Sequence, residues 1–284
     1  MKIIDVSEYQ GNIDWAKAAK EVDFVIMRAS ILQRKDNKYQ RNVDALEQLN
    51  IPYHAYHYIK ATTLDEARDE AKAFAEATKD SKPVFYIIDA EWSGIAASIA
   101  KDVIEEFEAE LRRSVKHDIR VAVYIGHDKY KSWALNYDRY AYVWIPRYGK
   151  NNGTVEGATK PSYTCDLWQY TSKGKVDGIK GNVDVSVLNG NKPLSFFLTG
   201  EGAYMNNNTI LQKGSKGREV KHLQSVLMAL GYDLGKYGAD GSYGNLTVAA
   251  VKSFQKDHGF QQTGTVTELL YDEMFVALVK NCAK

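Results

Sequence analysis

Short apolar runs alternate with amphipathic segments from Lys2 to about Pro193, and this alternation restricts the fold more than any other feature. Each run has the length and residue types of a β-strand; the runs are KIIDV, FVIMRA, YHAYHY, VFYIID, RVAVYIG, YVWIP, DLWQY and VDVSV. Between several of them apolar residues recur at helical spacing, most clearly over 64–78 and 98–115. Repeated strand–helix–strand units indicate an α/β fold with a parallel sheet, and about eight strands predict a β/α barrel of the TIM-barrel type.

The alternation stops after this region, which indicates a second domain. At 284 residues the chain is longer than one ordinary domain. Pro193, two glycines and a run of asparagines interrupt the strand–helix pattern. We therefore expect a first domain over 1–193, a linker over 194–208 and a second domain over 209–284.

The second domain is predicted to be a small bundle of three short helices separated by glycine-rich turns. Asp240, Gly241 and Gly244 are expected to form the turn before the second helix, with positive φ at the glycines and Thr247 as a cap. The apolar residues that define the helices are Val220, Leu223, Leu227 and Leu230; Val248, Val251 and Phe254; and Leu270, Met274, Ala277 and Leu278.

Composition disfavours two classes of partner. Lys and Arg number 37 against 36 Asp and Glu, so neither a nucleic-acid surface nor a polybasic membrane anchor is indicated. No apolar run approaches the roughly 18 residues of a membrane span. The segment 1–6 lacks the layout of a signal peptide, so we expect synthesis in the cytoplasm and release by lysis or through another protein's pore. A monomer is assumed.

The two cysteines are expected to be reduced and structural. Cys165 and Cys282 lie in different predicted domains, and neither belongs to a CxxC motif. No cofactor and no metal are predicted.

Four acidic residues are predicted to meet at one mouth of the barrel. Chemistry on this fold takes place at the carboxyl ends of strands, where the loops build the cleft. Asp5 ends the first strand, Asp89 and Glu91 end the run VFYIID, and Asp184 lies in the last strand. Clustering of like charges is costly, which favours a functional interpretation.

Asp89 and Glu91 have the spacing of an acid pair. Side chains at i and i+2 of a strand project to the same face, and like charges held close raise at least one pKa. A carboxyl that stays protonated can donate to a glycosidic oxygen, while an ionised neighbour orients water or stabilises positive charge on the sugar. Glycoside hydrolysis needs this division of roles.

Two other interpretations of these acids remain open at this point. They could form a structural ion-pair network with Arg28 or Arg147. They could also contribute to a metal site, for which His54 and His57 are the best-placed imidazoles.

Aromatic and polar residues also recur at the strand ends. Flat rings beside polar donors suit sugar faces and hydroxyls, although any one strand-borne aromatic could equally belong to the barrel core. The candidate substrate-binding residues are Arg28, Tyr58, Tyr124, Trp144, Trp168 and Gln169.

Several motifs occur in an order that resembles a known family over roughly Lys2 to Leu188. They are DVSEYQG from Asp5, FVIMRAS, IPYHAYHY, IIDAE ending at Glu91, WQYTS from Trp168, and VDVSV. In this order they resemble the lysozymes of glycoside hydrolase family 25, often called the Chalaropsis type and common in phage endolysins.

The resemblance implies a flattened β/α barrel that hydrolyses the β-1,4 bond between N-acetylmuramic acid and N-acetylglucosamine. It implies that Asp5, Asp89, Glu91 and Asp184 line the site. Glu91 would then be the general acid, and Asp89 and Asp5 would act on water or position the substrate's acetamido group. One departure is the segment Ser30 to Asn42, where the family usually has a glycine-containing loop; we expect it to border the cleft.

The second domain resembles the peptidoglycan-binding domain 1 family over its whole length. The resemblance rests on LQKGSKGREVKHLQSVLMALGY, DGSYGNLTVAAVKSFQKDHGF and TGTVTELLYDEM, in that order. It implies bacterial peptidoglycan as the partner, although a purely structural helical appendage is also possible.

The favoured hypothesis is a muramidase tethered to its insoluble substrate, acting as a phage endolysin that lyses the host. A hydrolase of another N-acetylated glycan such as chitin is the second hypothesis. A non-catalytic wall-binding protein is the third, and a missing acid would favour it.

Overall fold

A computed structural model describes residues 2–200, 210–267, 270–271, 273–274 and 276–278. The chain divides into two compact units, Met1–Lys192 and Pro193–Lys284. The predicted linker begins with a helix, α6 (Leu194–Thr199), and continues into residues outside the described part of the chain.

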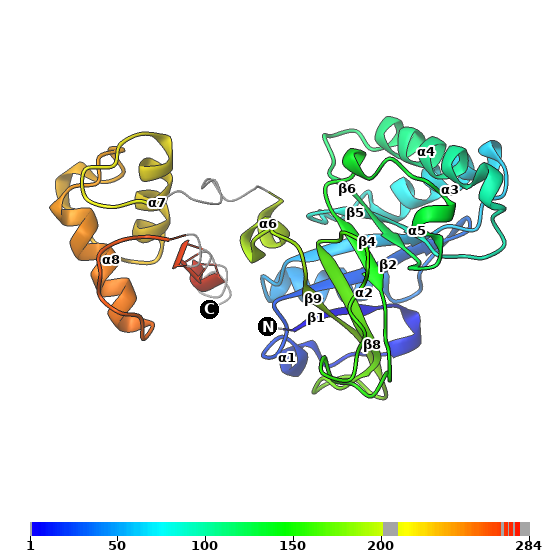
Figure 1. Ribbon diagram of the computed structural model, residues 1–284, viewed down its shortest axis with the longest axis horizontal. Helices are drawn as coiled ribbons and strands as arrows, with labels where there is room; N and C mark the ends of the chain where they lie inside the picture. The colour runs from blue at the N-terminus through cyan, green and yellow to red at the C-terminus, as the bar shows by residue number, and fades with distance from the viewer. Residues whose placement is uncertain (1, 201–209, 268–269, 272, 275, 279–284) are drawn as a thin grey trace. The chain divides into compact units, whose positions relative to one another are not determined.

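The first unit is a closed barrel of eight strands, as predicted, with a ninth short strand at its edge (Figure 1). The ring follows the order β1-β9-β8-β7-β6-β5-β4-β2 and closes because β1 also pairs with β2. The strands are β1 (Ile3–Val6), β2 (Phe24–Ile31), β3 (Arg34–Lys35), β4 (Tyr53–Tyr58), β5 (Tyr86–Ala90), β6 (Val121–Ile125), β7 (Val143–Pro146), β8 (Leu167–Gly174) and β9 (Val183–Leu188).

The expectation of a parallel sheet is wrong for one strand of the barrel, β9, and for the short edge strand β3, which runs antiparallel to β2. β9 runs antiparallel to both of its neighbours, β8 and β1. An antiparallel strand presents its amino end where its neighbours present their carboxyl ends. The start of β9 therefore lies at the same mouth of the barrel as the end of β1.

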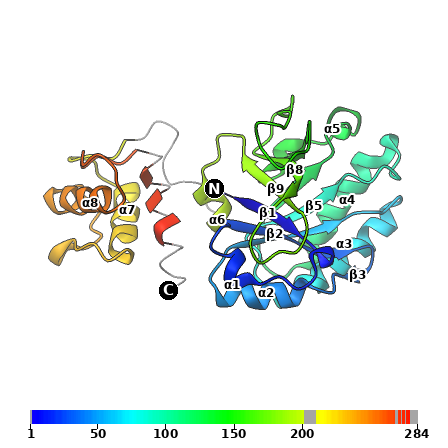
Figure 2. The ribbon, with the colours of Figure 1, turned by 90° about the horizontal axis from the view of Figure 1, so that it is seen from below.

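Helices cover the outside of the barrel (Figure 2). The longer ones are α2 (Tyr39–Gln48), α3 (Leu64–Thr78) and α4 (Ala97–Ser114); α1 (Trp15–Ala18) and α5 (Lys129–Ser132) are single turns. The α3 helix begins where the Thr63 side chain accepts a hydrogen bond from the Glu66 amide, 3.2 Å away. Its Ala67, Ala71 and Phe74 are buried, which fixes the face turned to the strands.

The second unit has its own apolar core, to which Val220, Leu227, Val251 and Phe254 contribute. Its helices include α7 (Arg218–Ala229) and α8 (Asn245–Asp257), and the described residues between 270 and 278 are helical. Among the described residues of both units, no helix has the length and apolar character that crossing a bilayer requires.

For the turn before α8, the positive φ predicted at Gly241 is confirmed. The positive φ predicted at Gly244 and the cap predicted at Thr247 are wrong. Gly241 has a φ of +77°, whereas Gly244 has a φ of −90° and is itself the N-cap residue. Thr247 is not a cap, because its hydroxyl accepts a hydrogen bond from the Gln224 side chain.

Candidate active site

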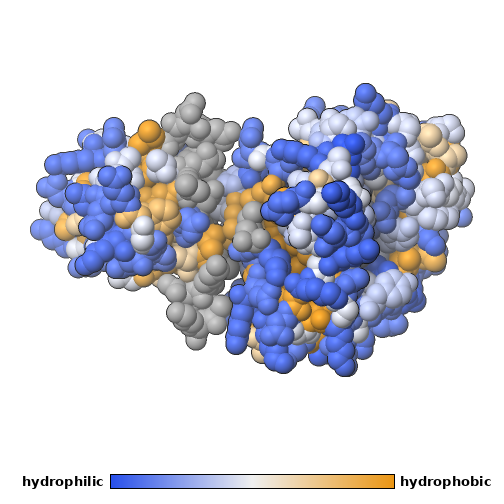
Figure 3. All heavy atoms as spheres, turned by 60° about the horizontal axis from the view of Figure 1, so that its bottom comes forward, coloured by the Kyte–Doolittle hydropathy of each residue, from blue (hydrophilic) through white to orange (hydrophobic). Residues whose placement is uncertain are grey.

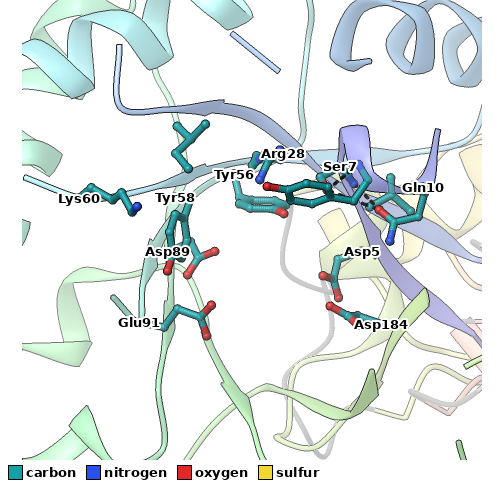
Figure 4. A pocket seen from close by; sticks show the side chains of 13 residues that line it. Asp5, Ser7, Gln10, Arg28, Tyr56, Tyr58, Lys60, Asp89, Glu91 and Asp184 are labelled. Atoms are coloured by element: carbon teal, nitrogen blue, oxygen red, sulfur yellow. Dashed lines mark hydrogen bonds between the residues drawn. The ribbon is translucent and has the colours of Figure 1, made fainter. Parts of the chain in front are cut away.

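A cleft with a volume of about 400 Å³ opens at the carboxyl ends of the barrel strands (Figure 4). Its walls come from β1, β2, β4, β5 and β9 and from the segment that follows β1. The residues that line it are Asp5, Val6, Ser7, Tyr9, Gln10, Arg28, Ile31, Tyr56, Tyr58, Lys60, Asp89, Glu91 and Asp184. All four predicted acids therefore meet in one cleft.

Asp5 and Asp184 form one pair of acids in this cleft. They are direct partners across the antiparallel pairing of β1 and β9, and Figure 4 shows their carboxyl groups facing each other. Burial raises the pKa of Asp5 well above its usual range, and the Asp184 carboxylate raises it further. Burial likewise raises the pKa of Asp184 to about 6. A hydrogen bond joins the two side chains, which requires that one of the two carboxyls carries a proton.

Asp89 and Glu91 form the second pair, at the end of β5. Asp89 is buried between Tyr58 of β4 and Tyr124 of β6, its partners in register. Its Oδ1 is a buried acceptor with no hydrogen-bond partner in the described part of the chain. Glu91 is only partly buried. Burial raises the pKa of both carboxyls, and for Asp89 the neighbouring Glu91 adds to the effect.

Gln169 on β8 connects the two acid pairs. Its Nε2 donates to Asp5 Oδ2 over 2.8 Å, and its Oε1 accepts from the hydroxyls of Tyr124 at 2.9 Å and Tyr148 at 2.6 Å. Tyr124 also makes a side-chain hydrogen bond with Glu91. The amide thus fixes the orientation of one acid in each pair.

Arg28 lines the cleft, but its charge is already paired. Its Nε donates to Asp36 over 2.9 Å and its Nη2 to Glu8 over 2.8 Å. Its guanidinium also lies 4.9 Å from the ring centre of Tyr9. Arg28 therefore forms its ion pairs with Glu8 and Asp36, and none joins it to Asp89 or Glu91 in the described part of the chain. Its positive charge still acts on Asp89, whose pKa it lowers against the larger effect of burial.

Tyr9 is a cleft residue that the sequence analysis missed. It lies in the 3₁₀ helix Glu8–Gln10, which a capping box between Ser7 and Gln10 holds in place. The side chain of Tyr9 is 81% exposed at the cleft, with the Arg28 guanidinium against its ring. Its position inside the motif DVSEYQG was the available signal.

The segment 30–42 borders the cleft at one point, through Ile31. Asp36 in this segment accepts a hydrogen bond from the Glu8 amide over 3.0 Å, and Arg34 pairs with the Glu8 carboxylate. Because these contacts hold the helix that carries Tyr9, the segment acts on the shape of the cleft through its ion pairs.

Arg147 and the two histidines considered for an ion-pair network or a metal site form hydrogen bonds with residues outside the acid cluster. Arg147 donates to the Lys160 carbonyl over 2.7 Å. His57 is buried, with Ser30 Oγ and Glu70 Oε2 each 2.8 Å from its ring nitrogens. His54 is buried and hydrogen-bonded to the Tyr142 hydroxyl over 2.8 Å.

The predicted substrate-binding residues occupy three kinds of position. Arg28 and Tyr58 line the cleft, whereas Tyr124 and Gln169 lie behind the acids and hold them. Trp144 and Trp168 are buried in the barrel wall, where their indole nitrogens donate to Ser186 Oγ and to the Arg147 carbonyl, respectively. Contact with substrate stays a prediction for all of them. Cleft or network residues that the predicted set lacked include Tyr9, Tyr56, Lys60 and Tyr148.

Two family models match the chain. The model described as glycosyl hydrolases family 25 matches residues 4–179, and the model described as a putative peptidoglycan binding domain matches residues 216–274.

Curated relatives include two enzymes of Bacillus licheniformis. One is the N-acetylmuramoyl-L-alanine amidase CwlL, 46% identical over 103 residues, and the other is a probable N-acetylmuramoyl-L-alanine amidase, 35% identical over 147 residues. These matches cover 36% and 51% of this chain but only 26% and 37% of the two relatives. Lysozyme M1 of Streptomyces globisporus is 24% identical over 203 residues, which is 66% of this chain and 67% of that protein.

Solved structures share the fold of the first unit. A glycosyl hydrolase 25 of Streptococcus pneumoniae is 24% identical, with a TM-score of 0.63 over 70% of this chain and 92% of that one. The catalytic domain of an endolysin from a bacteriophage of Listeria monocytogenes is 25% identical, with a TM-score of 0.60 over 66% of this chain and 93% of that one.

Proposed function

Because the chain belongs to glycosyl hydrolase family 25, we propose that it cuts the β-1,4 bond between N-acetylmuramic acid and N-acetylglucosamine in bacterial peptidoglycan. The second unit would hold the enzyme on the wall, a role that its match to the putative peptidoglycan binding domain supports. Binding to an insoluble polymer keeps the local concentration of the cutting unit high.

Glu91 is the proposed proton donor. It is the partly exposed acid of its pair, and burial raises its pKa, which favours the protonated form that a general acid needs. Its proton passes to the glycosidic oxygen as the bond to the anomeric carbon breaks, and the leaving sugar departs with a hydroxyl group. Water then adds to the anomeric carbon and returns a proton to Glu91.

Asp89 is the proposed partner of the reacting sugar. Its buried Oδ1, which has no hydrogen-bond partner among the described residues, can accept from the acetamido N–H of the substrate or from the attacking water. When ionised, Asp89 also stabilises positive charge that develops on the sugar ring. Asp5 and Asp184 share a proton beside it and would bind hydroxyls of the same sugar.

The observation that carries this proposal is the meeting of four acids with raised pKa values in one cleft. The test is to digest purified peptidoglycan, reduce the products with borohydride and identify the new reducing ends by mass spectrometry. We expect reduced N-acetylmuramic acid. Reduced N-acetylglucosamine as the new end, or faster cleavage of chitin fragments than of peptidoglycan, would contradict the proposed bond.

The biological setting that fits is lysis of a host by a phage. The similarity of the first unit to a phage endolysin catalytic domain supports it. The protein, supplied to bacteria whose walls are accessible and susceptible, should lyse the cells. Cells that stay intact while their purified walls are cut would contradict this setting.

A further inference from the structure

A cavity of about 330 Å³ lies on the second unit, between the 3₁₀ helix Gly235–Tyr237 and the start of α8. Its volume is within the range of about 300–1,000 Å³ that is usual for small-ligand sites. Buried Leu234 forms part of its wall, while Tyr237 and Leu246 are 62% and 45% exposed. Figure 3 shows a face of this unit on which hydrophobic side chains reach the surface between hydrophilic ones. Exposed apolar side chains around a hollow are typical of a binding site.

Gln224 holds the polar side of this cavity in a fixed geometry. It is 2% exposed, and its Nε2 donates to Asp240 Oδ1 at 2.9 Å, to the Ser242 carbonyl at 3.0 Å and to Thr247 Oγ1 at 3.1 Å. Its Oε1 accepts from the Gly241 amide at 2.7 Å. Because one buried amide joins α7, the turn and α8, the cavity needs little rearrangement to accept a ligand.

The charge of Asp240 restricts which polar groups a ligand can place in this cavity. The Ser242 amide and the Gln224 side chain both donate to Asp240 Oδ1, and these bonds lower the pKa of the carboxyl. Asp240 therefore stays ionised and can only accept. It suits a hydroxyl or amide donor and repels a carboxylate.

Lys236 places a positive charge next to the Tyr237 ring of this cavity. Its Nζ lies 5.1 Å from the ring centre of Tyr237, so one cation already occupies the attractive region of this ring. A ligand on this ring therefore meets the positive charge of Lys236 as well as the negative charge of Asp240, which favours a ligand without charge of its own. The peptides of peptidoglycan end in carboxylates and amino groups, whereas its glycan strands offer neutral sugars with hydroxyls, acetamido groups and apolar ring faces.

We propose that this cavity binds N-acetylated sugars of the peptidoglycan glycan strand, an inference that rests on the wall-binding role proposed above. The apolar face of a sugar packs against Tyr237, the acetamido methyl contacts Leu246, and a sugar hydroxyl donates to Asp240.

The test uses the full chain with Glu91→Gln, so that walls are bound without being cut. Retention on purified, sedimented peptidoglycan is measured for this parent and for the same chain with Tyr237→Ala or Asp240→Asn. Both variants share the catalytic cleft of the parent, so any difference belongs to the second unit. We expect each change to weaken retention by about tenfold, an effect of the size expected for one lost ring or hydrogen-bond contact. Peptide-free glycan strands should compete for the parent, and free stem peptides should not.

Ile210→Ser is the matched control, because Ile210 is 55% exposed and is not one of the cavity residues. It should leave retention unchanged, and all variants should keep the parent Tm. If the parent is retained and both cavity variants are retained equally well, the cavity is not the site. Competition by stem peptides alone would overturn the assignment to glycan. A parent chain that does not sediment with walls would overturn the wall-binding role and the cavity's part in it together.

Discussion

Asp5 and Asp184 lie directly opposite each other on the antiparallel strands β1 and β9, with a hydrogen bond between their carboxyl groups. Two carboxyls in this position can be hydrogen-bonded only if one of them carries a proton. Ionising both carboxyls at the mouth of the barrel therefore costs folding free energy, and this cost depends on pH.

Asp184→Asn should stabilise the fold at neutral pH while it lowers activity. Folding raises the pKa of Asp184 from 3.8 to about 6, so its ionisation costs more in the folded state. The free energy of unfolding then falls as pH rises from about 4 to about 6 and stays reduced above that. Asparagine cannot ionise and can donate to Asp5. After allowance for solvent screening, we expect a gain on the order of 1–2 kcal/mol at pH 7.

Thermal unfolding at pH 4, 5, 6 and 7 checks this prediction. The Tm difference between the variant and the native chain should grow over this interval to about 2–6 °C. A Tm difference that is the same at pH 4 and pH 7 would show that Asp184 is not the titrating group.

Glu91→Gln should reduce hydrolysis by about 10²- to 10⁴-fold, because glutamine keeps the shape of the side chain but has no proton to transfer. The measurement is turnover on purified walls, with retention on the same walls as a parallel readout. A substrate with an activated leaving group should rescue Glu91→Gln far more than Asp5→Asn. The control is Asp69→Asn, since Asp69 is an exposed acid that pairs only loosely with Lys72 at 3.6 Å. Turnover near that of the native chain in a folded Glu91→Gln protein would refute the acid role.

Tyr9→Ala should raise KM about tenfold and lower kcat much less, because the ring lines the cleft but is not one of the acids proposed to act on the reacting bond. Tyr9→Phe keeps the ring against Arg28 and should retain most of the affinity. Initial rates on soluble glycan fragments give both constants. Equal KM values for the native chain and Tyr9→Ala would remove Tyr9 from the substrate contacts.

A chain ending at Pro193 should fold and still cut soluble glycan fragments, because the first unit has its own core and all four acids. It should lose retention on sedimented walls. Thermal unfolding, fragment cleavage and sedimentation measure the three properties separately. Undiminished retention of the truncated chain would place wall binding in the first unit.

Replacing both cysteines by alanine should leave activity within a few-fold. Cys165 is buried, burial raises the pKa of its thiol to about 11, and the thiol contacts Asn189 rather than a cleft residue. Cys282 lies outside the described residues. The check is activity before and after treatment with a thiol-alkylating reagent. Rapid inactivation of the native chain without unfolding would contradict the structural role of the thiols.

Much of the fold could be predicted because it depends on local patterns. The apolar runs identified the strands, and the helix expected over 64–78 is α3. Residues at the carboxyl ends of parallel barrel strands lie at the same mouth, independent of the loop conformations. Asp5, Asp89 and Glu91 could therefore be placed there from their positions in the sequence alone. Asp184 reached the same mouth for a different reason, the reversed direction of β9.

The sequence by itself determined which residues form strands and which acids end them, since both follow from periodicities of a few residues. Only the tertiary structure decided the direction of β9, the pairing of Arg28 with Glu8 and Asp36, and the use of Gln169 to orient Asp5. Gln169 and Asp5 are 164 positions apart. Contacts of this kind form only when the barrel closes, because closure is what brings β8 and β1 to the two sides of β9.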